Sequence, residues 1–278
     1  MRFFAVLLLI LSLFNSCSLN NVETDNSFKK YFDEHKVDGC FALLDNGTGK
    51  FTIYNLPRYR DSSFLPASTF KIVNSLIGLQ TGKITDDSMV IKWDGITRTN
   101  ANWNKDLTMY EAFRVSAVPY YQEVARRIGK DTMEYWLNRM KYGAVTDSSK
   151  VTIRTTIDSF WLDNSLKVTP DMQLELVRQL YFEQLPGFFK LNQEMVKQAM
   201  LWESKVKYSL SYKTGWGISN ANTGRQQGWI VGWIEENNHP YFFVLNFETN
   251  DRNADIAAIR MDILKKCLTQ MGFFEGKM

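Results

Sequence analysis

The sequence predicts an α+β protein: a central antiparallel sheet formed by both ends of the chain, flanked by helices, with a helical region inserted between the strands. Segments typical of strands lie near the N-terminus and return after residue 205. Apolar residues at helical spacing fill the region between them. The 278 residues are 45% hydrophobic and 14% aromatic, which is enough for a large buried core and unlike a disordered chain.

Residues 1–17 predict an export signal. An apolar run over residues 3–14 is too short to span a bilayer and follows a basic residue. A small residue and then Cys17 come next, as in a bacterial lipobox, and residues 18–27 are polar like a tether. We expect Cys17 to be lipidated, which would attach the protein to a membrane surface; an ordinary cleaved signal peptide is the alternative. Both place the protein outside the cytoplasm.

The sheet is predicted to begin in residues 38–65. Two short apolar runs there flank an Asn-Gly pair at 46–47, which is typical of a β-hairpin. From Ser68 the pattern becomes helical with apolar residues on nearly all sides, which predicts a buried helix ending at Gly82. This helix opens a helical region over 66–204. Further helical patterns cover residues 109–113, 119–128, 132–140, 170–180 and 192–200.

Strand patterns return in residues 205–278, where a turn sequence at 237–240 predicts a second hairpin. The chain closes with a helical pattern over 255–271. We therefore expect a single domain over residues 28–278. The predicted late strands are 206–213, 228–235 and 241–247.

Charge and composition exclude several functions. The net charge of +3, from 33 basic and 30 acidic residues, gives no reason to expect nucleic-acid binding. None of the two histidines and three cysteines lies at zinc-ligand spacing to another, so we predict no metal site. In an exported protein Cys40 and Cys267 could form a disulfide or remain as two buried thiols, and the sequence leaves both open.

The segment Ser68-Thr69-Phe70-Lys71 is the first candidate for chemistry. Ser68 and Lys71 lie one turn apart on one face of the predicted helix, whose N-terminal N–H groups can stabilise an oxyanion. Burial lowers the pKa of a lysine amine, and a neutral amine can act as a base or react with carbon dioxide. The alternative is a capping serine beside a solvated lysine, because Ser-x-x-Lys occurs twice more in the chain.

Two further segments carry suitable polar groups. Lys213-Thr214-Gly215 closes a predicted strand, where a lysine, a hydroxyl and a glycine that lets a ligand approach the backbone suit an anionic substrate. A plain strand end is the alternative. Ser116 lies between two predicted helices and by itself indicates little.

Together these segments resemble the serine β-lactamase and penicillin-binding superfamily, in which Ser-x-x-Lys, a loop serine and Lys-[Ser/Thr]-Gly occur in this order. The sequence resembles class D β-lactamases (oxacillinases) in particular, over nearly the whole chain after residue 38. The resemblance implies the serine β-lactamase/transpeptidase-like fold and an exported, periplasmic enzyme. It rests on segments 66–71, 92–95, 116–118, 142–143, 160–162, 213–215 and 228–233.

The resemblance implies hydrolysis of β-lactam antibiotics through an acyl-enzyme on Ser68. Lys71 corresponds to the family's N6-carboxylysine, whose carbamate is the general base for acylation and deacylation. Carbon dioxide or bicarbonate is then required, and no metal or organic cofactor. Trp161 corresponds to the tryptophan that holds the carbamate, and Ser116 to the serine that relays a proton to the leaving nitrogen.

The resemblance also implies the substrate-binding residues. Val118 and Leu162 correspond to apolar residues that wall the carbamate. The backbone N–H groups of Ser68 and Trp216 correspond to the oxyanion hole. The residues that correspond to the part of the family's site that receives the substrate carboxylate are Lys213, Thr214, Gly215 and Arg260.

One segment departs from the family pattern. The family usually has Tyr-Gly-Asn where this chain has Tyr142-Gly143-Ala144, and residues 146–156 form a longer stretch. We therefore expect a changed loop near the site and assign no catalytic role to Tyr142.

Two other functions fit the same motifs: a non-hydrolytic β-lactam sensor domain and a peptidoglycan transpeptidase or carboxypeptidase. The Trp161 segment and residues 228–233 favour the hydrolase. We expect small-molecule β-lactams as partners and no nucleic acid, and the resemblance leaves monomer and homodimer open.

Overall fold

The computed structural model describes residues 21–143 and 150–275. The predicted signal segment with Cys17, and Ala144 of the departing segment, lie outside these residues. None of the helices in the described ranges has the length and apolar character needed to cross a bilayer.

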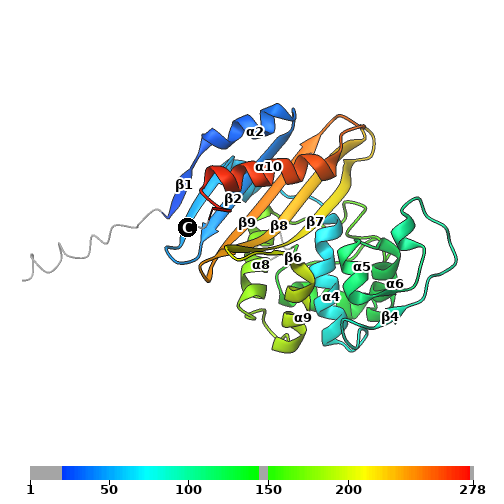
Figure 1. Cartoon of the computed structure of the whole chain (residues 1–278). Coiled ribbons are helices and arrows are strands. Elements are labelled where there is room, and N and C mark those ends of the chain that lie inside the picture. The colour runs from blue at the N-terminus through cyan, green and yellow to red at the C-terminus, as the bar shows by residue number, and fades with distance from the viewer. Residues whose placement is uncertain (1–20, 144–149, 276–278) are drawn as a thin grey trace, which may run out of the picture.

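A seven-stranded sheet forms the centre of the molecule, in the order β1-β3-β2-β9-β8-β7-β6 (Figure 1). Neighbouring strands are antiparallel, apart from β1 and β3, which pair in parallel. The prediction of an α+β fold whose sheet is built from both ends of the chain is confirmed. The strands are β1 (Val22–Thr24), β2 (Asp38–Asp45), β3 (Lys50–Tyr54), β6 (Leu201–Ser204), β7 (Tyr208–Asn220), β8 (Arg225–Glu236) and β9 (His239–Thr249).

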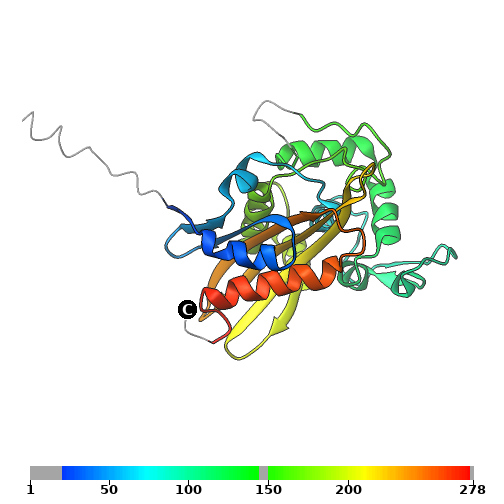
Figure 2. The ribbon, with the colours of Figure 1, turned by 90° about the horizontal axis from the view of Figure 1, so that it is seen from above.

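Helices cover both faces of this sheet. Helices α2 and α10, which come from the two ends of the described chain, lie side by side on one face, and the helices from the middle of the chain cover the other (Figures 1 and 2). A separate small sheet of β4 (Val90–Ile91) and β5 (Leu107–Thr108) lies next to α5. The helices are α2 (Lys29–Glu34), α3 (Leu56–Asp61), α4 (Lys71–Gln80), α5 (Met109–Arg114), α6 (Val118–Ile128), α7 (Lys130–Arg139), α8 (Pro170–Tyr181), α9 (Lys190–Met200) and α10 (Ile256–Gln270).

Three boundaries differ from the sequence-based prediction. Val22–Thr24 joins the sheet as β1, so the prediction of a tether over 18–27 is wrong for these residues. The sheet also takes β6 from the end of the predicted helical region. The predicted helix at Ser68 starts instead with a 3-10 turn, Ala67–Phe70, and α4 begins at Lys71. The turn places Ser68 before the α-helix rather than within it.

The sheet separates two cores, because successive residues of a strand point to opposite faces. On β2, Phe41 and Leu43 join the core under α10, whereas Cys40 and Ala42 join the core under the middle helices. Cys267 of α10 belongs to the first core, so the two cysteines lie on opposite faces and both are free thiols. Burial raises the pKa of the Cys40 thiol to about 12.

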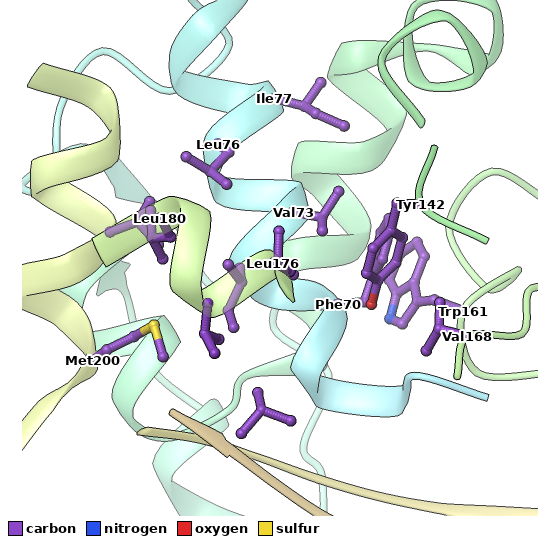
Figure 3. Packing of buried hydrophobic residues seen from close by; sticks show 14 of the residues in the cluster. Phe70, Val73, Leu76, Ile77, Tyr142, Trp161, Val168, Leu176, Leu180 and Met200 are labelled. Carbon is purple, nitrogen blue, oxygen red and sulfur yellow. The ribbon is translucent and has the colours of Figure 1, made fainter. Parts of the chain in front are cut away.

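Helix α4 runs through the middle of the second core. Its residues from Lys71 to Leu79 are all buried, as the apolar pattern predicts. Figure 3 shows its side chains among those of α8 and α9 and the aromatic residues beside the start of the helix. Lys71 therefore begins a helix with no exposed face along its length. This burial determines the protonation state of the Lys71 amine.

Candidate active site

A cavity of about 980 Å³ lies along β7, between the Ser68 turn, the start of α6 and the first half of α10. Lys71, Trp161 and Lys213 are almost fully buried. The structure thus brings residues from distant parts of the chain to one place. The predicted site residues that line the cavity are Ser68, Ser116, Val118, Leu162, Thr214, Trp216 and Arg260.

The hydroxyl of Ser68 accepts a hydrogen bond from the amine of Lys71, with 2.9 Å between Oγ and Nζ. The alternative of a helix-capping serine is wrong, because the cap of this turn is Pro66 and no side chain caps it. Ala67, just before Ser68, has a φ of 49°, a conformation that a non-glycine residue holds only when its surroundings impose it. The turn therefore presents the Ser68 hydroxyl to the cavity with the lysine amine behind it.

Burial lowers the pKa of Lys71 from its usual 10.5 to about 7. No charged group contributes to this shift. The centre of the Tyr121 ring lies 5.4 Å from Nζ. At neutral pH the Lys71 amine is thus neutral in a large share of molecules, whereas the amine of an exposed lysine is almost always protonated.

Trp161 presents a buried donor without an acceptor. Its ring stacks on Phe70 at 5.1 Å, and its carbonyl accepts a hydrogen bond from the Ala67 N–H, so it is fixed against the Ser68 turn. Its indole Nε1 is buried and has no hydrogen-bond partner. A buried N–H without a partner is unfavourable, and at a site it suits an added acceptor group.

Lys213 joins the β7 side of the site to the loop before α6. Its Nζ donates to Ser116 Oγ at 2.5 Å and to the Thr214 carbonyl at 3.1 Å. Burial, followed by the positive charges of Lys71 and two arginines, holds the pKa of Lys213 well below its usual value. Ser116 has a φ of 53°, so its position in the loop is also imposed by its surroundings.

Arg260 reaches the same site from α10. Its Nη1 donates to the Gly215 carbonyl at 3.2 Å, and its Nε is buried without a partner. Burial lowers the pKa of this guanidinium. Gly215 allows β7 to pass the Ser68 turn closely, because a Cβ there would lie 3.1 Å from the Pro66 carbonyl. Trp216 beside it is 55% exposed and lines the cavity opening.

Positive groups dominate the cavity. Arginines 98, 114 and 260 line it, and its lining contains no carboxylate. Arg98 is paired with Asp94 at 2.6 Å, whereas no ion pair within the described ranges includes Arg114 or Arg260. The arrangement suits an anionic ligand. The described residues also contain no group of three or more His, Cys, Asp or Glu placed to hold a metal ion.

A buried network that the sequence reasoning missed supports the Ser68 turn. Gln173 of α8 donates to the Thr69 hydroxyl at 2.6 Å, and that hydroxyl donates to the Pro66 carbonyl at 2.7 Å. Tyr142 donates to the Gln173 side-chain oxygen at 3.3 Å. A glutamine on the apolar face of a predicted helix is the signal that could have indicated it. Through this network Tyr142, which does not line the cavity, supports the Ser68 turn.

Comparison with known proteins gives the family of this fold and site. Residues 39–269 match the penicillin binding protein transpeptidase domain. The chain is 35% identical over 269 residues to beta-lactamase OXA-5 of Pseudomonas aeruginosa, covering 96% of this chain and 97% of that protein. The structure of FUS-1 (OXA-85), a class D β-lactamase from Fusobacterium nucleatum subsp. polymorphum, matches with a TM-score of 0.81 and 33% identity over 91% of this chain and 100% of that one. The chain belongs to the class D β-lactamase family.

This class D β-lactamase is also similar to a receptor domain. The C-terminal domain of the BlaR penicillin receptor from Bacillus licheniformis matches with a TM-score of 0.82 and 28% identity, over 91% of this chain and 97% of that one. Fold similarity alone therefore does not separate an enzyme from a receptor. The predicted changed loop lies partly outside the described residues, which resume at Lys150 after the gap.

Proposed function

We propose that this chain hydrolyses β-lactam antibiotics through an acyl-enzyme on Ser68. The observation that carries the proposal is the 2.9 Å contact between Ser68 Oγ and a buried lysine amine whose pKa is about 7. Ser68 Oγ attacks the lactam carbonyl, the ring C–N bond breaks and the nitrogen takes a proton. Water then cleaves the ester and releases the ring-opened acid.

We further propose that Lys71 carries a carbamate formed from carbon dioxide. The reaction needs the neutral amine, which adds to carbon dioxide and releases a proton, and a pKa of about 7 makes that form abundant. The buried Trp161 Nε1, which has no partner, would donate to the group, and Val118 and Leu162 would limit water around it. When present, the group supplies a base for acylation and for deacylation.

The other residues then take complementary parts. The Ser116 hydroxyl would pass a proton to the departing nitrogen, and the hydrogen bond that it accepts from Lys213 at 2.5 Å supports this role. The backbone N–H groups of Ser68 and Trp216 would stabilise the oxyanion, because Gly215 lets β7 approach the Ser68 turn. Thr214 and Arg260 would bind the substrate carboxylate at the positive end of the cavity.

Repeated turnover is the test that decides this proposal. The purified protein is expected to hydrolyse a chromogenic penicillin many times per Ser68, followed by absorbance under steady-state conditions. A stoichiometric burst without further turnover would refute hydrolysis. It would instead support a penicillin sensor, the second candidate function, which is considered because the chain is also similar to the BlaR receptor domain.

Activity is expected to depend on bicarbonate most strongly below about pH 7, because the Lys71 amine, with a pKa of about 7, is protonated there and loses carbon dioxide. Steady-state rates in degassed buffer should fall as the pH is lowered and recover when bicarbonate is added. Trp161→Phe keeps the packed ring but removes the N–H donor. It should therefore need about 10 to 100 times more bicarbonate for the same rate. A rate independent of bicarbonate at every pH would contradict a carbamate on Lys71.

We also propose export through the apolar segment 3–14, followed by lipidation of Cys17. The intact mass of the protein isolated from cell membranes distinguishes a lipidated Cys17 from an N-terminus produced by ordinary cleavage. An unlipidated N-terminus would contradict the anchor but would leave the hydrolase proposal untouched.

A further inference from the structure

The cavity has an aromatic wall that the catalytic residues leave unused. Strand β6 pairs Leu201 with Ser211 and Glu203 with Leu210, so Trp202 is the extra residue of a β-bulge. A bulge redirects the side chain of the residue it inserts. Trp202 lines the cavity and is 36% exposed, so part of this residue remains open to a ligand.

Two neighbours hold this ring in place. Tyr212 stacks on Trp202 at 5.2 Å with an angle of 9° between the rings, and its carbonyl accepts a hydrogen bond from the indole N–H at 3.0 Å. The guanidinium carbon of Arg114 lies 3.5 Å from the centre of a Trp202 ring, and the same guanidinium donates to the Leu201 carbonyl. We call Arg114, Trp202 and Tyr212 the Trp202 wall. Its flat surface is fixed before any ligand arrives.

The wall lies at the positive end of the cavity. Tyr212 immediately precedes Lys213 on β7, and the charges of Glu203, Arg114 and Arg260 all act on it. The two arginines line the cavity, whereas Glu203 does not. No carboxylate of the described residues pairs with Arg114, and its carbonyl contact engages only Nη1. The wall therefore combines an aromatic face with a cation that has unused N–H donors.

We propose that the Trp202 wall binds a planar, negatively charged substituent on the ring carbon next to the carboxylate-bearing carbon of a bicyclic β-lactam. This inference rests on the proposed function, which places the lactam carbonyl at Ser68 and the carboxylate at Thr214 and Arg260. A substituent on the adjacent carbon is then directed beyond Arg260 toward Tyr212. A flat heteroaromatic ring there packs against the exposed part of Trp202 beside the Arg114 guanidinium, and its acidic group accepts hydrogen bonds from Arg114.

Three cephalosporins with one shared acyl side chain test the wall. Their substituents at this carbon are methyl, a neutral heteroaryl-thiomethyl group, and the same group with an added carboxylate. We expect Arg114→Gln to lower kcat/KM for the acidic compound about tenfold relative to the neutral heteroaryl compound. Arg114→Lys, which keeps the charge, should retain the order of preference. Trp202→Ala should lower kcat/KM for both heteroaryl compounds relative to kcat/KM for the methyl compound.

Tyr135→Ala removes an aromatic residue of α7 that is 56% exposed and outside the cavity. It should therefore leave the ratios of kcat/KM among the three compounds unchanged. The proposal would be overturned if the ratios of kcat/KM among the three compounds were unchanged in the variants of Arg114 and Trp202, or if kcat/KM fell equally for all three compounds. A change confined to penicillins that differ in the acyl side chain would also overturn it, because the wall would then face that group. The rate at which each compound alone acylates Ser68, followed by intact mass, gives the same ranking even without turnover. Failure of the wall is thus distinguishable from failure of the hydrolase proposal.

Discussion

Ser68→Ala is expected to abolish acylation by any β-lactam, with kcat/KM falling about 10⁶-fold, as when other enzymes lose a nucleophile. The reason is local, because Ser68 Oγ lies in the cavity and accepts the hydrogen bond of the Lys71 amine. No other hydroxyl has this contact with the lysine within the described residues. Intact mass after incubation with a penicillin measures the effect directly, because the acyl-enzyme adds the mass of the substrate.

A matched control separates chemistry from folding. Ser209→Ala removes a half-buried serine of the same strand, β7, that carries Lys213, and it should leave acylation unchanged. The unfolding midpoint of Ser68→Ala should also stay close to that of the parent, because the hydroxyl is partly exposed. A penicillin adduct that persists in Ser68→Ala would refute Ser68 as the nucleophile.

Lys71→Met is expected to slow both acylation and deacylation by about 10² to 10⁴-fold, which is the contribution of a positioned base. Methionine fills a similar unbranched volume without a charge, so the fold of α4 should be kept. Single-turnover measurements separate the two steps, because mass spectrometry follows the acyl-enzyme as it forms and decays. A loss confined to one step would contradict a base shared by both.

The same substitution is expected to raise stability. In the unfolded chain the amine has its usual pKa of 10.5, whereas burial lowers it to about 7 in the fold. The unfolded state therefore binds more protons between these values, so the amine destabilises the fold fully below about pH 7 and not at all above about 10.5. The stabilisation by Lys71→Met should be larger at about pH 6 than at about pH 9 in degassed buffer. Lys83→Met, which removes an exposed lysine, is the control for the loss of a surface amine.

A fall in stability in Lys71→Met at low pH would mean that the lysine has a structural role. The expected opposite result, greater stability with lost activity, identifies a group kept for chemistry at the expense of the fold.

Local sequence patterns predict much of the fold. The continuous apolar character after Ser68 predicts a buried helix, and α4 is buried along nearly its whole length. The Asn-Gly pair at 46–47 predicts the turn that joins β2 and β3. Where the prediction was wrong, at β1 and β6, the segments are short strands that pair with partners distant in sequence or carry a bulge. Their own residues provide little periodicity from which to recognise them.

The sequence by itself determined the contacts that depend on short separations. Ser68 and Lys71 are three residues apart, so any helical turn places them on one face, and an apolar neighbourhood lowers the pKa of the amine. Only the tertiary structure decided the contacts between distant segments: the unpaired Trp161 donor, the pairing of Lys213 with Ser116, and the separation of Cys40 from Cys267 by the sheet. Those contacts depend on how the loops of the helical region pack against the Ser68 turn and β7, and on which face of the sheet each strand residue points. Burial of apolar surface and strand register across the whole domain, rather than any local spacing, set both.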